Sequence, residues 1–158
     1  MCYKDRYYNN LKIRKMDIKH NLKIKASTET IYNAVSTEKG IQGWWSKDCN
    51  VGEKEDEKSI LKFNKEGNIV EMGFETLKLE PKKKVVWECV ENSNPAWLQT
   101  KITTEIFETS EGCEVLFTHG GFDEKWKGNE AFEMTKGGWQ HFTQSLVDYC
   151  EKGTGQPW

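Results

Sequence analysis

The chain has 158 residues and balances 23 Lys and Arg against 25 Asp and Glu, which gives a formal net charge of −2. That length predicts one domain with one substantial core, and the balanced charge excludes the basic footprint of a nucleic-acid-binding protein. No apolar run reaches the roughly 18 residues of a membrane-spanning helix, and the amino terminus lacks the apolar core of a signal peptide. We therefore expect a cytoplasmic protein that does not insert into a membrane.

Residues 1–15 differ from the rest of the chain. They carry five basic side chains against one acidic side chain, together with three tyrosines, and show no hydrophobic period. We predict a flexible N-terminal extension over residues 1–15, dispensable for folding, and a compact domain over residues 16–158. Because exposed tyrosines suit a contact surface, a homodimer is an open alternative.

The domain is expected to open with a strand and two short helical segments. Residues 17–25 alternate, with Ile18, His20, Leu22 and Ile24 on one face and lysines opposite, which is typical of a strand with one wet side. Ser27 or Thr28 can cap a short helix over TETIYNAVST. Gly40 should end a second brief turn.

Trp44 and Trp45 follow that turn directly. In an extended chain two neighbouring side chains point to opposite faces. We therefore expect at most one of these tryptophans to enter the core.

Five further segments have strand patterns, which brings the expected sheet to about six strands. They are residues 59–64, 69–81, 85–91, 98–108 and 113–119, with a turn at KEGN and a bulge after Thr76 where the apolar phase moves by one residue. Gly120 and Gly121 should break the last of them. Short turns between consecutive strands predict an antiparallel sheet.

The stretch from Asn129 onward predicts one long terminal helix. Trp139, Phe142, Leu146 and Tyr149 recur at three- and four-residue steps, so one face is apolar. Gly153, Gly155 and Pro157 should end the helix near Lys152. The fold class is thus α+β, with a curved antiparallel sheet of about six strands wrapped on this helix.

Two glycines interrupt the helix pattern at Gly137 and Gly138. Each glycine inside a helix costs about 1 kcal/mol relative to alanine. The pair therefore indicates either a close contact with the sheet or room left for a ligand.

The cysteines and histidines indicate neither a disulfide framework nor a metal site. The five cysteines are scattered and form no C-x-x-C pair, so we predict free thiols. The three histidines lie far apart without ligand spacing. We expect no metal and no cofactor.

Three quoted stretches resemble a known family. TETIYNAVSTEKGIQGWWSKD after the first strand, EVLFTHGGFDE, and above all GGWQHFTQSLVDYCEKGTGQP are similar to the START-like, or SRPBCC, superfamily, in the branch of the activator of the heat-shock protein 90 ATPase. The resemblance covers residues 17–158. It implies the helix-grip fold, as in START and Bet v proteins, with an apolar cavity between the sheet and the last helix.

The cavity suggests a non-catalytic carrier or sensor for a small apolar, aromatic or lipid-like molecule. A chaperone-associated module and a cyclase- or aromatase-like enzyme are the alternatives, and we identify no catalytic residue. The inward phases and the helix entrance select eight candidate ligand-binding residues: Trp45, Met72, Phe74, Trp87, Phe117, His119, Trp139 and Phe142.

His119 has two interpretations among these candidates. It ends the face shared by Val115 and Phe117, next to the glycine pair where the strand should stop near a mouth. A buried imidazole usually bonds locally to backbone. Direct contact with a ligand is the alternative.

Overall fold

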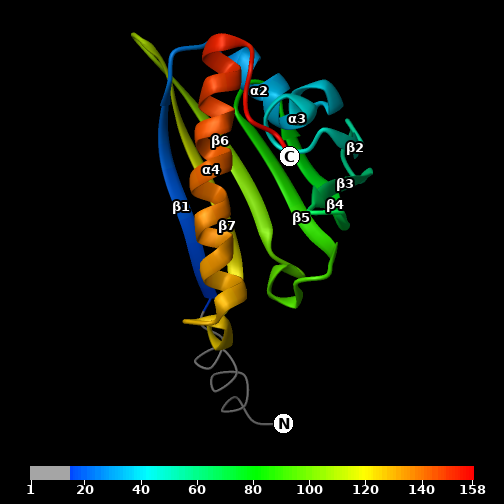
Figure 1. Cartoon of the computed structure of the whole chain (residues 1–158). Helices are drawn as coiled ribbons and strands as arrows, with labels where there is room; N and C mark the ends of the chain where they lie inside the picture. Colours follow the sequence, from blue (N-terminus) through cyan, green and yellow to red (C-terminus); the bar gives the residue numbers. More distant parts are fainter. Residues whose placement is uncertain (1–14) are drawn as a thin grey trace.

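The computed structural model describes residues 15–158, which form a curved antiparallel sheet of seven strands wrapped on one long helix (Figure 1). The predicted fold class is confirmed. The predicted extension lies outside the described residues except for Lys15, which opens the first strand. The strands are β1 (Lys15–Ile24), β2 (Asp48–Asn50), β3 (Lys58–Lys65), β4 (Asn68–Glu80), β5 (Lys84–Asn92), β6 (Lys101–Thr109) and β7 (Gly112–Asp123).

The strand order is β1-β7-β6-β5-β4-β3-β2. Strands β2 to β7 therefore form consecutive antiparallel neighbours, and only β1 crosses over to pair with β7. The strand missing from the sequence-based count is β2, which is only three residues long and too short to show a period. β1 and β2 are the two edges.

The β3–β4 hairpin turns on Glu66 and Gly67, both with positive φ (52° and 85°). Two positive φ values in a two-residue loop are the geometry that matches the twist of the flanking strands. The turn lies within the predicted KEGN stretch, although Asn68 already belongs to β4.

The strand pairing shifts register at three places, two between β4 and β5 and one between β1 and β7. The pairing of β4 with β5 shifts between Thr76 and Lys78, which confirms the predicted bulge. The expectation that Gly120 and Gly121 break the last strand is wrong. β7 runs on to Asp123 because Gly121, at φ 87°, is the extra residue of a bulge opposite β1, where its N–H donates to Asp17 Oδ1 at 3.1 Å.

The two short helices are α2 (Thr28–Ser36) and α3 (Glu38–Trp44). Ser27 caps α2, as predicted, by accepting from the N–H of Thr30. Gly40 does not end the second turn, because α3 continues to Trp44.

The expectation for the tryptophan pair is also wrong. Trp44 and Trp45 are 1% and 3% exposed, and their rings stack with centroids 5.5 Å apart. The chain is helical up to Trp44 rather than extended, so neighbouring side chains do not point to opposite faces. Trp44 Nε1 donates to the carbonyl of Ala34 on α2 at 2.7 Å.

The long helix is α4 (Glu130–Lys152), capped by Asn129 and ended by Gly153 at φ 80°. The helix ends at Gly153, as the sequence predicted, because glycine adopts this left-handed conformation without strain. In Figure 1 the helix lies across the concave face of the sheet, over β1 and β7, with α2 and α3 beside its C-terminal half. Within residues 15–158, no helix combines the length and apolar character that crossing a bilayer requires.

After α4 the chain turns back along α3 as a C-terminal segment (residues 153–158). Ser145 Oγ donates to the Trp44 carbonyl at 2.7 Å and accepts from the N–H of Gln156 at 2.6 Å. The backbone of Trp158 is bonded to the carbonyl of Trp45 and the N–H of Lys47. The segment is therefore held against both helices.

Candidate functional site

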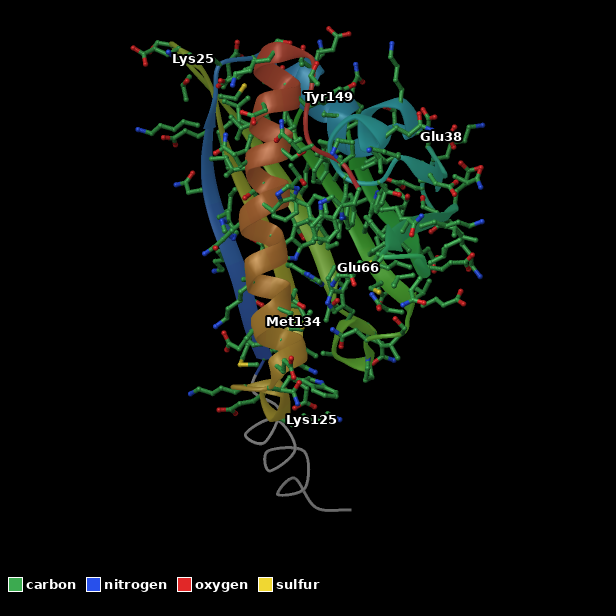
Figure 2. All side chains as sticks on the ribbon, in the orientation of Figure 1. Lys25, Glu38, Glu66, Lys125, Met134 and Tyr149 are labelled. Atoms are coloured by element: carbon green, nitrogen blue, oxygen red, sulfur yellow. The ribbon has the colours of Figure 1, made fainter. Side chains whose placement is uncertain are left out.

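A cavity of about 470 Å³ lies between the N-terminal half of α4 and strands β3, β4 and β5. It exists because α4 covers β1 and β7 while the other half of the concave face stays free of the helix (Figure 1). Met134 on α4, labelled in Figure 2, is one of the residues that line it.

The cavity wall is mostly aromatic. Its six rings are those of Trp45, Phe63, Trp97, Trp139, Phe142 and Trp158. They come from the end of α3, from β3, from the β5–β6 connection, from α4 and from the C-terminal segment. Such a surface removes a large apolar area of a ligand from water.

Four of the eight predicted site residues line this cavity: Trp45, Met72, Trp139 and Phe142. The other four, Phe74, Trp87, Phe117 and His119, are buried but do not line it. They face inward as expected, yet they lie behind the first layer of rings.

Trp45 connects the two layers. Its ring centroid lies 5.2 Å from Trp139 in the wall, 5.5 Å from Phe74 and 6.2 Å from Trp87 behind it. Tilted rings at these distances are favourable contacts. The second layer therefore fixes the position of the wall.

His119 is the polar centre of the second layer. It is 0% exposed. Its Nδ1 accepts a hydrogen bond from Trp139 Nε1 at 2.8 Å, and its Nε2 lies 2.7 Å from Thr100 Oγ1. Both ring nitrogens are hydrogen-bonded within the protein, but to side chains distant in sequence and not to the local backbone, as had been expected.

These partners determine which ring nitrogen of His119 carries the hydrogen. Trp139 Nε1 can only donate, so Nδ1 is unprotonated and Nε2 carries the hydrogen. Thr100 accepts from Nε2 and donates its own proton to the carbonyl of Trp97. Burial lowers the pKa of His119 to about 3, so the ring is neutral at physiological pH and serves to hold Trp139.

A second hydrogen bond holds the ring of Trp97, next to Trp139 in the wall. Trp97 Nε1 donates to Thr135 Oγ1 at 2.9 Å, and Thr135 in turn donates to the carbonyl of Ala131. The Trp97 and Trp139 rings are nearly parallel, with an interplanar angle of 21° and centroids 6.0 Å apart. α4 and the β5–β6 connection are thus joined at the cavity.

One end of the cavity carries a free hydrogen-bond donor. Asn92 Oδ1 accepts from the N–H of Asn94 at 2.7 Å, which fixes the orientation of the amide. Its Nδ2 is buried without a hydrogen-bond partner within residues 15–158.

The neighbouring Cys89 thiol is a weak acceptor for this amide. Burial raises the pKa of Cys89 to about 11 although the contact with Asn92 lowers it. The thiol is therefore protonated at neutral pH. Because an amide NH₂ has two donors, at least one N–H of Asn92, a residue that lines the cavity, has no acceptor within residues 15–158.

The mouth of the cavity is formed by Lys65 and Trp158. The Lys65 ammonium lies 6.0 Å from the centroid of the Trp158 ring, and that ring packs on Phe142 at 5.0 Å. Both residues also border a shallow surface hollow next to β2 and β3. The cavity thus opens to solvent beside a cation.

Gly138 lines the cavity, whereas Gly137 is exposed. A Cβ atom added at either glycine would meet nothing within 4 Å. The pair is therefore not required for a close approach of α4 to the sheet, and the remaining interpretation is space beside Trp139.

Sequence reasoning missed Phe63, Trp97, Trp158, Asn92 and Lys65. Phe63 was detectable, because it alternates with Leu61 in a strand pattern. The others lie at strand ends or in irregular segments, where no period marks an inward position.

The described residues offer no metal centre or activated thiol. No three His, Cys, Asp or Glu side chains among them gather into a group that could hold a metal. Cys49, Cys89, Cys113 and Cys150 are free and buried, as predicted, and Cys2 lies outside the described residues. Burial raises the pKa of Cys49 to about 11 and that of Cys150 to about 12, which keeps these thiols protonated.

The chain matches one protein-family model and resembles several solved structures. Residues 25–151 match the family model described as activator of Hsp90 ATPase homolog 1-like protein. The solution structure of the Aha1 dimer from Colwellia psychrerythraea is similar over 89% of this chain and 99% of that chain, with 31% identity and a TM-score of 0.72.

More distant structures share the fold. A crystal structure from Staphylococcus saprophyticus is 20% identical over 89% of this chain and 96% of that chain, with a TM-score of 0.70. An AHSA1-like protein from Aeromonas hydrophila is 11% identical over 85% of this chain and 91% of that chain, with a TM-score of 0.66. A comparison with curated protein sequences gives no significant match.

Proposed function

Because the chain belongs to the family of activator of Hsp90 ATPase homolog 1-like proteins, we propose that it uses the cavity of this fold to bind a small apolar, aromatic or lipid-like molecule. It would act as a carrier or sensor rather than as an enzyme. The proposal concerns the cavity between α4 and strands β3 to β5.

The observation that carries the proposal is an open cavity with an aromatic wall. Its volume of about 470 Å³ lies within the range of roughly 300 to 1,000 Å³ for small-molecule pockets. Hydrogen bonds that Trp139 donates to His119 and Trp97 donates to Thr135 hold two of its rings in place. A preorganised wall lowers the ordering cost of binding.

Calorimetric titration with decanol tests the proposal. We expect binding in the micromolar range, since each buried CH₂ contributes about 0.8 kcal/mol, accompanied by a change in tryptophan fluorescence. If neither decanol nor an aromatic alcohol such as naphthalenemethanol produces heat or a fluorescence change, the cavity is not a binding site for such molecules.

A second candidate function is a chaperone-associated module. It is favoured by the family description and by the 31% identity to a Colwellia psychrerythraea chain named Aha1. Such a module would use the outer face of the sheet and not the cavity. Co-sedimentation with purified heat-shock protein 90, together with its ATPase rate, tests this candidate, and an unchanged rate without complex formation would reject it.

Dimer formation belongs to the same proposal, since the Colwellia psychrerythraea protein is a dimer. Among residues 15–158, β1 pairs only with β7, so the other side of this ten-residue strand has no partner strand within the described part of the chain. Light scattering coupled to size-exclusion chromatography should give twice the chain mass of 18.4 kDa. A mass that stays at one chain at all concentrations tested would reject the dimer.

A further inference from the structure

We infer that the ligand of this cavity is an apolar molecule with a carboxylate at one end, and that the carboxylate binds at the mouth beside Lys65. This inference rests on the proposed function and names the chemical class of the ligand. Three observations support it: the polar groups at the cavity are a cation and a hydrogen-bond donor, Lys65 forms no ion pair within residues 15–158, and the Trp158 ring lies beside the Lys65 ammonium.

The side-chain charge at the cavity is positive. Among the lining residues that belong to the described part of the chain, 15–158, Lys65 is the only one that is charged at neutral pH, and none is acidic. The buried free group at the other end, Nδ2 of Asn92, is likewise a hydrogen-bond donor. The cavity therefore favours acceptors and anions over ammonium ligands.

Three lysines of the sheet are held in ion pairs, whereas Lys65, the lysine at the cavity, is not. Lys62 pairs with Glu71 at 3.7 Å, Lys78 with Glu80 at 3.1 Å, and Lys84 with Glu105 at 3.6 Å. Within residues 15–158, Lys65 forms no ion pair, although Glu66 is its neighbour in sequence. Its ammonium is thus available to an anion that enters the mouth.

Trp158 keeps this ammonium at the mouth. The ring lies 6.0 Å below the Lys65 ammonium, a distance at which the π face attracts a cation. The ring is held in turn by Phe142 and by the backbone bonds of Trp158 to Trp45 and Lys47. A partly fixed cation loses less side-chain entropy when it binds an anion.

The mouth suits a carboxylate better than the Asn92 end does. Asn92 Nδ2 is buried, and a carboxylate taken there would lose its hydration for one neutral donor. Lys65 is exposed, so a carboxylate beside it keeps part of its water shell. The apolar part of the ligand would then extend inward along the aromatic wall.

A matched series of C10 ligands tests the inference: decanoate, decanol and decylamine, titrated into the full chain at pH 7.5 and low salt. Decanoate should bind about threefold to fivefold more tightly than decanol, the range of an exposed ion pair, and decylamine more weakly than both. The preference should shrink in 1 M NaCl, because salt screens exposed charges.

The variant Lys65→Met should remove the preference by weakening decanoate about threefold to fivefold while decanol changes less than about twofold. Lys62→Met is the matched control, because Lys62 is already paired with Glu71 and does not line the cavity. It should keep the preference. Thermal melts of both variants check that they fold.

Three outcomes would overturn the inference and leave the proposed function intact. Decanol and decanoate could bind equally, decylamine could bind most tightly as in an aromatic cage, or the preference could survive Lys65→Met and vanish in Asn92→Leu. Binding of none of the three ligands would instead overturn the proposed function, and the inference with it.

Discussion

At the residue scale, His119 supports the cavity wall without lining the cavity. The sequence places it correctly on the inward face of β7, because Cys113, Val115, Phe117 and His119 alternate. Its partners Thr100 and Trp139 lie 19 and 20 residues away along the chain. No local sequence pattern could have predicted that both ring nitrogens would be hydrogen-bonded within the protein.

The pH dependence of stability follows from this burial. In the unfolded chain His119 should titrate near 6.5, whereas in the folded protein its pKa is about 3. The unfolded state therefore binds the extra proton between these values, and stability falls as the pH decreases. Urea titrations should show that wild type loses about 3 kcal/mol more than His119→Gln between pH 7.5 and pH 4.5.

Trp139→Phe is the control for this measurement. It removes the donor to Nδ1 and should lower stability at every pH, but it leaves His119 buried. Because desolvation causes the shift, the slope with pH should remain close to that of wild type. Equal slopes in wild type and His119→Gln would contradict the assignment to His119.

Gly138 gives a prediction about the cavity itself. Gly138→Leu should fill the space beside Trp139 and weaken decanol at least about tenfold. The helix should gain up to about 1 kcal/mol from the loss of a glycine. Calorimetry and a thermal melt measure the two effects.

Gly137→Leu is the matched control, because it brings the same gain in helix propensity at an exposed position. It should bind decanol as wild type does. If Gly138→Leu costs about 1 to 3 kcal/mol of stability and still binds, the site is overpacked rather than open. Trp139 would then not belong to the cavity wall.

At the scale of elements, regular segments were predictable and their junctions were not. β1, β6 and α4 have sustained periods, so their existence and faces follow from the sequence. The errors lie at Gly40, at Trp44 and Trp45, and at Gly121. At each of these positions the sequence carries a turn signal, but tertiary contacts decide whether the chain stops, bulges or stays helical.

The C-terminal segment illustrates a junction that no period reveals. Ser145 is fully buried on α4 and bridges the Trp44 carbonyl and the N–H of Gln156. Ser145→Ala would leave a buried carbonyl and a backbone N–H without this partner. We expect a loss of about 1 to 3 kcal/mol in urea unfolding, together with faster amide exchange at Gln156.

Thr143→Val is the comparison, because Thr143 is also buried on α4 but donates only to the Trp139 carbonyl within the helix. It should leave amide exchange at Gln156 unchanged. If Ser145→Ala leaves exchange at Gln156 unchanged as well, the segment is held by other contacts.

At the scale of the whole molecule, four of the eight predicted residues line the cavity, and most of its other lining residues were not predicted. Strand and helix phases identify inward residues, and these include Trp45, Met72, Trp139 and Phe142. Strand and helix periods do not reveal which part of the concave face α4 covers. The position of α4 decides which inward residues line the cavity and which, such as Phe74, Trp87 and Phe117, lie behind its wall.

The domain boundary gives the last prediction. β1 begins at Lys15, which pairs with Asp123, so the deletion to test is residues 1–14. A shortened chain that begins at Lys15 should melt within about 2 °C of the full chain, because its sheet is complete. A loss of several degrees would show that residues 1–14 contribute to the fold or to a dimer.

The crossover of β1 also sets the order in which the sheet can be completed during synthesis. Ile24 pairs with Cys113, a residue made roughly 90 positions later, which takes about 5 to 18 s at ribosomal speeds. During that interval β1 has no partner, while β3 to β6 can already form hairpins with their neighbours. Lys19, Lys23 and Lys25, which alternate with its apolar residues, would then keep the waiting strand from pairing with other nascent chains. The first strand to leave the ribosome is therefore the last to join the sheet, and its pairing should limit the folding rate.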